Sequence, residues 1–250
     1  MKSFFLTDRG KVRQHNEDSC GVFTNKDGDL LAIVADGMGG HRAGDVASQM
    51  TISTLKELWE ESSAIDSPEI AEQWLQQHIL HVNTILYNHS QMNSECQGMG
   101  TTFVGAICTP KFSTIGHIGD SRCYILNETG FKQITDDHSL VGELVRLGQI
   151  SKEDAEYHPR KNVVLRALGT EVSVEMDKKT IILEDDDYLL LCSDGLSNKV
   201  PDEVMKEILL QSESLDKKAE TLISLANENG GEDNITLVIV QYSSESEVGE

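Results

Sequence analysis

The chain has 250 residues, and 42 acidic against 21 basic residues give it a net charge of −21. So acidic a surface repels the phosphates of nucleic acids and of anionic membranes, which excludes a general nucleic-acid binder and a membrane-surface protein. The length allows a sizeable buried core, in one domain or two.

The N-terminal part of the sequence predicts three strands. Residues 3–8, 19–24 and 30–35 are rich in apolar side chains. Asp27-Gly28 separates the second strand from the third and is a typical hairpin turn. A calcium loop at Asp27-Gly28-Asp29 is the alternative, but the ligand spacing does not continue.

Two long helices are expected next. Apolar residues recur at helical spacing over residues 43–60, and again from residue 68 to about residue 90. Ser67-Pro68 is a helix start, because serine caps free N–H groups and proline suits the first helical position. We interpret His78 and His81 as helix-face residues rather than as metal ligands.

From Gly98 onward the pattern returns to strands. They are expected at residues 101–108, 112–118, 122–127 and 131–134. Residues 136–169 are polar apart from a short helical pattern at 140–147. Such an interruption beside strands indicates a mobile surface segment.

The C-terminal part mixes strands and helices. Strands are expected at 172–183, 187–192 and 235–241, and helices at 202–210 and 215–228. Because short turns join most strands, the sheets should be antiparallel, with helices covering a sheet face. Residues 1–242 then form a single domain, and the acidic tail 243–250 should be disordered.

Several carboxylates stand at the ends of apolar runs. Asp36, Asp120 and Asp194 each follow a run of strand-like apolar residues. Carboxylates held at the tips of buried strands repel one another unless a cation neutralises them. Hard divalent cations with oxygen ligands are their natural partners.

The cysteines and the absence of long apolar runs bear on location. The five cysteines (Cys20, Cys96, Cys108, Cys123 and Cys192) are scattered, and no CxxC occurs. They are interpreted as reduced thiols. No apolar run approaches membrane-spanning length, and the N-terminus lacks a signal-peptide pattern. The sequence therefore predicts a cytoplasmic protein.

Eight short motifs follow one another along the chain. They are RxxNED at 13–18, ADGMGG at 35–40, GMGTT at 98–102, GDSR at 119–122, DHS at 137–139, NVVLRALG at 162–169, CSDGL at 192–196 and EDNIT at 232–236. Their order and spacing resemble the metal-dependent protein phosphatases of the type 2C family, in its bacterial serine/threonine branch. The resemblance covers residues 3–241. It implies an α+β fold, a four-layer α-β-β-α sandwich of two antiparallel sheets flanked by helices, with metals at one edge between the sheets.

The same resemblance implies a metal centre. It holds two core Mn²⁺ or Mg²⁺ ions, with a third ion in many bacterial relatives. Asp36 matches the residue that bridges the two core ions, and Gly37 matches the one that gives its backbone carbonyl to one of them. Asp194 and Asp233 match the residues that complete the first metal site, and Asp120 together with Asp194 matches those that hold the third ion.

Three further features belong to these assignments. Glycine suits position 37 because a carbonyl turned toward an ion needs unusual backbone angles. Glu17 and Asp18 match acidic residues that hold metal-bound waters. The simpler alternatives are strand-end turns or helix caps for the aspartates, and surface charge for Glu17 and Asp18.

Arg13 matches the phosphate-binding arginine of the family. A guanidinium group can bind two phosphate oxygens at once, which a lysine cannot do, although an exposed turn arginine is the alternative. The implied mechanism is hydrolysis of phosphoserine and phosphothreonine in proteins by a metal-activated water, in line with the leaving oxygen and without a covalent intermediate.

The general acid is left open by the sequence. Animal relatives have histidine directly after the Asp-Gly pair, whereas this chain has Met38, which cannot donate a proton. His41 is a candidate, and a metal-bound water is the alternative. Residues 136–169 match the family's flap, in which His138, His158 and Arg166 are expected to position groups or to face the substrate.

Two other classes compete with this interpretation. A cysteine phosphatase needs an arginine six positions after its cysteine, and none of the five cysteines has one. A catalytically inactive regulatory or docking module of the same fold is the second class, and the complete set of aspartates argues against it. We expect a signalling phosphatase with phosphoprotein substrates, including a serine/threonine protein kinase, and with neither nucleic acid nor membrane as partner.

Overall fold

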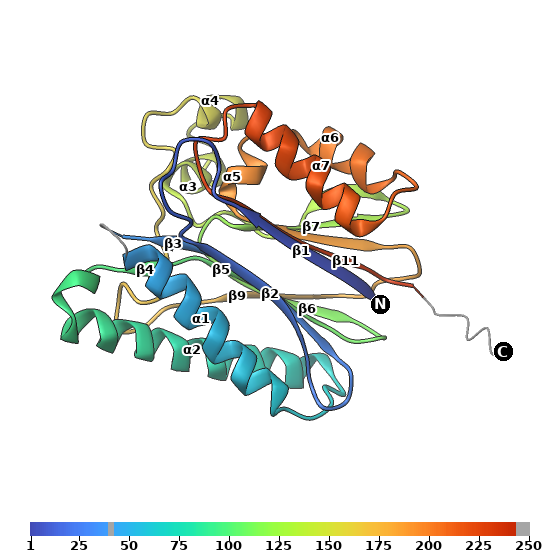
Figure 1. The fold of residues 1–250 in the computed structure, drawn as a ribbon, viewed down its shortest axis with the longest axis horizontal. Coiled ribbons are helices and arrows are strands. Elements are labelled where there is room, and N and C mark those ends of the chain that lie inside the picture. Colours follow the sequence, from blue (N-terminus) through green and yellow to red (C-terminus); the bar gives the residue numbers. More distant parts are fainter. Residues whose placement is uncertain (40–42, 244–250) are drawn as a thin grey trace.

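Two antiparallel sheets lie face to face, and helices cover the outer face of each sheet (Figure 1). The computed structural model describes residues 1–39 and 43–243. This is the α+β sandwich that the motifs predicted.

The first sheet joins the two ends of the described chain. Its order is β1 (Lys2–Asp8), β11 (Ile235–Gln241), β10 (Tyr188–Cys192), β7 (Arg122–Asn127) and β8 (Gly130–Gln133). All neighbouring strands are antiparallel. Thr7 lies opposite Thr236 in the register, so the loop after β1 meets the turn before β11.

The second sheet carries the first hairpin. Its order is β2 (Asp18–Thr24), β3 (Leu30–Met38), β5 (Phe103–Cys108), β6 (Ser113–Ile118) and β9 (Asp177–Ile181), with the short β4 (Gly100–Thr101) paired to β3. The expected turn between β2 and β3 is confirmed. The Asn25 side chain accepts hydrogen bonds there from the N–H groups of Asp27 and Asp29, at 3.1 and 2.9 Å.

The helices outside residues 136–169 fall into two groups, one for each sheet (Figure 1). Helices α1 (Ala43–Glu60) and α2 (Pro68–Met92) pack on the second sheet, and α5 (Asp194–Ser197), α6 (Asp202–Leu209) and α7 (Leu215–Glu228) pack on the first. Helix α2 begins where the sequence predicted. The Ser67 hydroxyl accepts from the Ile70 N–H at 3.4 Å, and proline follows at the first helical position.

Strand β3 shows why the central strands read as continuous apolar runs. Leu31 and Ile33 belong to the cluster under α1 and α2, whereas Ala32 and Val34 belong to the cluster between the sheets. Both faces of the strand are therefore buried. The ends of β3, β6 and β10 stay fixed in this core, so the polar residues at those ends are held rigidly.

The expected strand at 172–183 is wrong in its first half, because β9 starts only at Asp177. The Asn83 side chain from α2 donates to the carbonyl oxygens of Glu171 and Val172, at 3.0 and 3.3 Å. These carbonyls bind a helix instead of a neighbouring strand. The sequence also missed the short elements β4, η1 (Ser94–Cys96), α4 (Lys152–Glu156) and α5.

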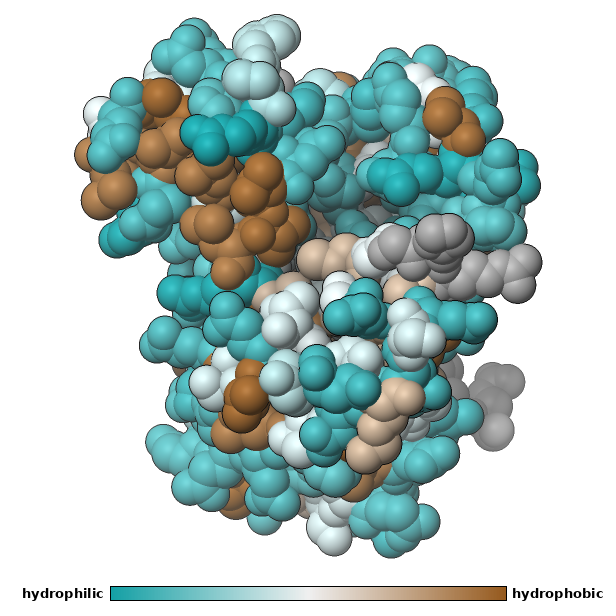
Figure 2. Space-filling view, turned by 90° about the vertical axis from the view of Figure 1, so that its left-hand side faces the viewer, coloured by the Kyte–Doolittle hydropathy of each residue, from teal (hydrophilic) through white to brown (hydrophobic). Residues whose placement is uncertain are grey.

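Residues 136–169 contain α3 (Leu140–Arg146), where the helical pattern was predicted, and α4. No residue of α3 is buried. Figure 2 shows apolar side chains gathered over this part of the surface, and Leu147, Val163 and Leu165 are 55, 40 and 53% exposed. Apolar surface of this kind is typical of a binding face.

Two further expectations concern the ends of the chain and the membrane. The tail predicted to be disordered, 243–250, lies outside the described residues except for residue 243. Within residues 1–39 and 43–243, no helix has the length and apolar character that crossing a membrane requires.

Candidate functional site

Strand pairing brings the first two acidic motifs together. Asp18 lies opposite Asp36 in the β2–β3 register. Thr102 ties Asp36 to the next strand, because its N–H donates to the Asp36 carbonyl and its hydroxyl accepts from the Asp36 N–H, both at 2.9 Å. The Thr102 hydroxyl also contacts the Ser121 hydroxyl at 2.7 Å, next to Asp120. Asp18, Asp36 and Asp120 thus belong to one bonded network.

The C-terminal motifs join the same network. The Ser193 hydroxyl donates to the Asp18 carboxylate at 2.7 Å and accepts from the Thr236 N–H at 3.0 Å. Asp194 follows as the first residue of α5. A Cβ atom on Gly195 would collide with the Asn234 carbonyl and lie 3.5 Å from Asp233 Cβ. Only glycine allows α5 to come this close to the turn before β11.

Position 37 needs glycine for a different reason from the predicted one. Gly37 lies inside β3 and is not among the glycines with positive φ. A Cβ atom there would collide with the carbonyl oxygens of Gly44 and Glu17. The Gly37 N–H donates to that Glu17 carbonyl at 3.1 Å. The close approach of α1 and the RxxNED segment, rather than unusual backbone angles, excludes a side chain here.

The converging carboxylates are strongly destabilised as anions. The pKa of Asp36 is raised well above its ordinary value, by desolvation first and then by the negative charges of Asp18, Asp194 and Asp120. Desolvation likewise raises the pKa of Asp18 and of Asp120 to about 7, and that of Asp194 to about 6. Asp36 keeps partial contact with solvent. Largely buried carboxylates, one of which still reaches solvent, suit a hard divalent cation.

The oxygen-only chemistry fits such an ion, but the side chains are not preassembled around one. Among the residues that the structure describes, no three His, Cys, Asp or Glu side chains stand together as a ready metal site. Their charges nevertheless act on one another, which places them within electrostatic reach.

Arg13 lies at this cluster and forms an ion pair with one of its carboxylates. Its Nη2 is 2.8 Å from Asp233 Oδ2, and its Nε donates to the Glu232 carbonyl at 3.3 Å. The Arg13 side chain is 48% exposed, so it can turn toward a ligand. Glu17 lies close by, and burial raises the pKa of its carboxyl group.

The expected general acid cannot be placed. His41 lies outside the described residues, together with residues 40 and 42. Met38, which precedes this gap, is the last residue of β3.

His138 connects residues 136–169 to the cluster. Its N–H donates to the Gly119 carbonyl at 2.8 Å, and its Nδ1 accepts from the Gly119 N–H at 3.1 Å. Its Nε2 lies 3.2 Å from Asp177 of β9, and Arg166 Nη1 lies 3.0 Å from the same carboxylate. His138 and Arg166 therefore hold the segment against the residue before Asp120. The His158 side chain, in contrast, makes only a local hydrogen bond within the described part of the chain, accepting from the Arg160 N–H at 3.2 Å.

Sequence reasoning missed several supporting residues. Asp137 binds Arg122 through both carboxylate oxygens at 2.7 to 3.1 Å, and Asn198 donates to Asp194 at 3.0 Å. Asp177, the shared partner of His138 and Arg166, had no signal of its own. Asp137 lies in DHS and Arg122 in GDSR, so the pairing of these two motifs could have been suspected.

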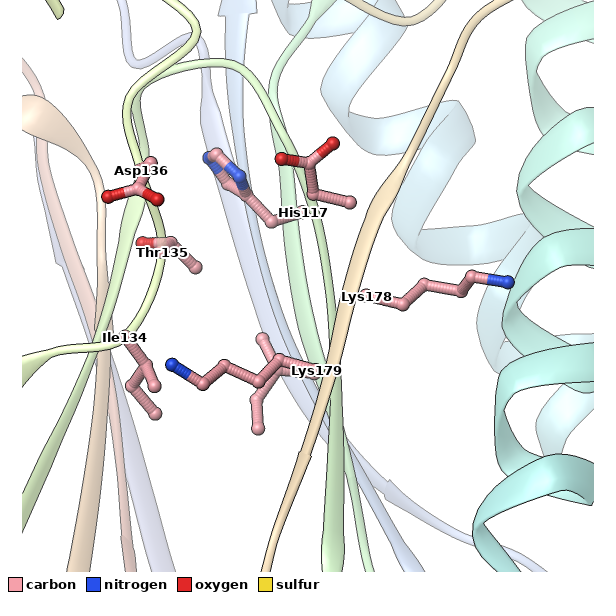
Figure 3. Close-up of a pocket in the computed structure, with 8 residues that line it drawn as sticks. His117, Ile134, Thr135, Asp136, Lys178 and Lys179 are labelled. Atoms are coloured by element: carbon pink, nitrogen blue, oxygen red, sulfur yellow. The ribbon is translucent and has the colours of Figure 1, made fainter. Parts of the chain in front are cut away.

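A hollow of about 150 Å³ lies between β6, β9 and residues 134–136 (Figure 3). Its lining contains none of the predicted site residues. Lys179 extends into it, whereas Lys178 turns away toward α2 and Glu72 (Figure 3). His117 forms part of its wall, is 2% exposed, and lies against the tilted His138 ring with ring centroids 4.5 Å apart.

His117 should make the stability of the fold depend on pH. Burial, followed by the neighbouring His138, lowers the pKa of His117 from 6.5 to about 4. Between these two pKa values the unfolded chain binds a proton at this histidine and the folded chain does not. The contribution of neutral His117 to the free energy of unfolding is therefore complete above pH 6.5 and is lost as the pH falls toward 4. Denaturant unfolding of wild type and His117→Gln should show their difference shrinking by about 2 kcal/mol between about pH 7.5 and about pH 5. A difference independent of pH would contradict a buried neutral imidazole.

Comparisons with known proteins agree with this geometry. The family described as protein phosphatase 2C matches residues 8–234. Serine/threonine phosphatase Stp of Listeria monocytogenes is 51% identical over 241 residues, covering 96% of each chain. Protein phosphatase PhpP of Streptococcus pneumoniae is 38% identical over 245 residues, covering 98% of this chain and 99% of the relative.

Solved structures give the same picture. Serine/threonine phosphatase Stp1 from Staphylococcus aureus superposes with a TM-score of 0.93 at 39% identity, covering 97% of this chain and 95% of that one. The catalytic domain of the serine/threonine protein phosphatase PstP, in complex with two manganese ions, superposes with a TM-score of 0.85 at 35% identity. It covers 97% of this chain and 98% of that one.

Proposed function

The chain belongs to the protein phosphatase 2C family and is a serine/threonine protein phosphatase that acts on phosphoproteins, and from this premise we propose a metal centre and a role for each site residue. Asp36, the Gly37 carbonyl, Asp194 and Asp233 would hold two core ions, Mn²⁺ or Mg²⁺. Asp120 together with Asp194 would hold a third ion. The observation that carries this proposal is the convergence of four other carboxylates on Asp36, whose pKa is raised by desolvation and by the charges of Asp18, Asp194, Asp120 and Asp233.

The remaining residues serve the substrate and the solvent. Glu17 and Asp18 hold water molecules near the ions, and the hydrogen bond from Ser193 fixes the orientation of the Asp18 carboxylate. Arg13 leaves Asp233 and binds two oxygens of the phosphoryl group, which sets the direction of attack. The ions, when bound, lower the pKa of a water molecule and neutralise the phosphoryl oxygens.

Hydrolysis then needs no covalent enzyme intermediate. Water attacks phosphorus in line with the departing seryl or threonyl oxygen, and the bond from phosphorus to that oxygen breaks. The leaving oxygen takes a proton from His41 or from a water held at the site. His138 and Arg166 position residues 136–169 beside the cluster, where the exposed apolar surface contacts the substrate.

We also propose where the enzyme acts and on which proteins. Residues 1–242 make up a single catalytic domain of a cytoplasmic signalling enzyme, and a serine/threonine protein kinase is among its substrates. The composition supports the cytoplasmic assignment, because the five cysteines are all free thiols in the structure. The competing hypothesis of an inactive docking module is not favoured, because Asp36, Asp120, Asp194 and Asp233 are all present.

Metal removal tests the proposal directly. Purified protein should release phosphate from a phosphothreonine peptide and from an aryl phosphate when Mn²⁺ is added. Excess chelator should reduce the rate to the uncatalysed level, because four carboxylates alone repel the anionic substrate. Renewed Mn²⁺ should restore it. Turnover that persists after complete metal removal would overturn the proposed centre.

A further inference from the structure

The segment that carries Arg13 is an irregular loop folded around the turn before β11. Residues 9–17 lie between β1 and β2 and contain neither helix nor strand. The loop rests on the turn, because the Gly231 carbonyl accepts from the N–H groups of Lys11 and Val12, at 2.8 and 3.2 Å. Arg13 follows Val12 directly. The direction of the Arg13 side chain therefore depends on how firmly this loop is held.

Asn234 holds the loop from inside. The residue is buried, with 4% of its surface exposed. Its Nδ2 donates to the carbonyls of Arg9 and His15, at 2.8 and 3.0 Å, and its Oδ1 accepts from the Glu17 N–H at 2.8 Å. The side-chain amide thus uses both of its donors and its acceptor on this one loop. Arg13 lies between the points that Asn234 fastens.

The two ends of the loop meet at this amide. Arg9 begins the loop and Glu17 ends it, and both bond to Asn234. Compact surface loops whose ends lie close together are Ω-loops, and contacts inside them maintain their shape. Truncation of Asn234 would leave two carbonyls and one N–H without this partner, and segments with unmade hydrogen bonds open more easily. The position of Arg13 would then no longer be fixed.

We propose that Asn234 is the positioning residue for Arg13 and holds the loop so that the guanidinium meets the phosphoryl group in one fixed direction. This inference rests on the proposed function, in which Arg13 binds two phosphoryl oxygens. A guanidinium binds two oxygens at once only when its plane is aligned with them. A loosened loop would keep the positive charge near the substrate and lose that alignment. Asn234 is buried beneath the loop and acts through Arg13.

A double-mutant cycle at saturating Mn²⁺ tests this role. Arg13→Ala should lower kcat/KM on a phosphothreonine peptide by about thirtyfold, as expected for lost hydrogen bonds to a charged group. Asn234→Ala should lower it by about tenfold, because the guanidinium is present but misaligned. In protein that already lacks Arg13, Asn234→Ala should change kcat/KM by less than about twofold. An equal loss in both backgrounds is the mark of a merely structural residue and would overturn the proposal.

Asn25→Ala is the matched control. Asn25 is likewise buried, with 6% of its surface exposed, and its side chain both donates and accepts hydrogen bonds in the β2–β3 turn. This turn lies at the opposite end of β2 from Asp18. Asn25→Ala should leave kcat/KM within about twofold of its parent, with or without Arg13. A loss as large as that of Asn234→Ala would show that lost stability, not alignment, lowers the rate.

Amide hydrogen exchange examines the loop without any turnover. In wild type, the Glu17 amide should exchange at least about tenfold more slowly than in an unfolded chain, because Asn234 Oδ1 accepts from it. Asn234→Ala should remove most of this protection, whereas Asn25→Ala should leave it in place. A Glu17 amide that exchanges freely in wild type would overturn the proposal, even if the Asn234 variant fails to fold.

The cycle also separates this inference from the proposed function. If Arg13→Ala alone left kcat/KM unchanged, the phosphate role of Arg13 would be refuted. A large effect of Arg13→Ala, followed by an additive loss from Asn234→Ala, would contradict the role of Asn234 alone.

Discussion

Asp36→Asn should lower kcat on phosphopeptides and aryl phosphates by about a thousandfold or more, while the protein stays folded. Desolvation and the negative charges of four other aspartates raise the pKa of Asp36, and Asp36 is the residue proposed to bridge the two core ions. Asparagine keeps the shape but removes the negative charge. Steady-state kinetics at saturating Mn²⁺, with circular dichroism as a check on folding, would measure the effect.

The fold should tolerate this substitution because the backbone holds the position. The N–H and carbonyl of Asp36 are bonded to Thr101 and Thr102, and its carboxylate makes no hydrogen bond to a described residue. Asp27→Asn is the matched control, since Asp27 is exposed in the turn at the other end of β3 and should leave kcat unchanged. A variant at position 36 with wild-type turnover would refute the assignment.

The same substitution should stabilise the metal-free protein. Without a cation, Asp36 and the carboxylates around it repel one another in desolvated surroundings. Removing one of these charges should increase the free energy of unfolding by about 1–3 kcal/mol and raise Tm by about 2–8 °C near pH 8. Mn²⁺ should then stabilise wild type more than the variant, by mass action on the folded state.

The pH dependence of this gain follows from the direction of the pKa shift. When folding raises the pKa of a carboxyl group, the free energy of unfolding falls as the pH rises from the ordinary pKa of the group, here 3.8, toward its pKa in the folded protein. The advantage of Asp36→Asn over wild type should therefore be small near pH 4 and should grow as the pH rises above it. Thermal unfolding of metal-stripped proteins checks it, with Asp27→Asn in parallel. A variant less stable than wild type at pH 8 would mean that the carboxylate supports the fold.

Local signals in the sequence predicted their part of the structure well. Ser67-Pro68 started a helix and Asp27-Gly28 made a turn, because the groups that decide these features lie within a few residues. The start of β9 could not be found in this way. The Asn83 side chain donates to the carbonyl of Glu171, 88 residues further along the chain, and no local sequence pattern predicts that contact.

In the candidate site, too, local motifs were predictable and contacts between distant residues were not. Family motifs indicated the aspartates, and the structure brings their strand ends together. The ion pair between Arg13 and Asp233 joins residues 220 positions apart. The motifs showed that position 37 needs glycine, but only the packing of Gly44 and Glu17 against it showed why.

Anomalous diffraction from Mn²⁺-soaked crystals, collected at the manganese edge, tests the central claim most directly. The account predicts two strong peaks bridged by Asp36, with Asp194 and Asp233 completing the ligands of the first ion and Arg13 released from Asp233. Manganese peaks away from Asp36, or a single peak that leaves Asp36 without a metal contact, would contradict it.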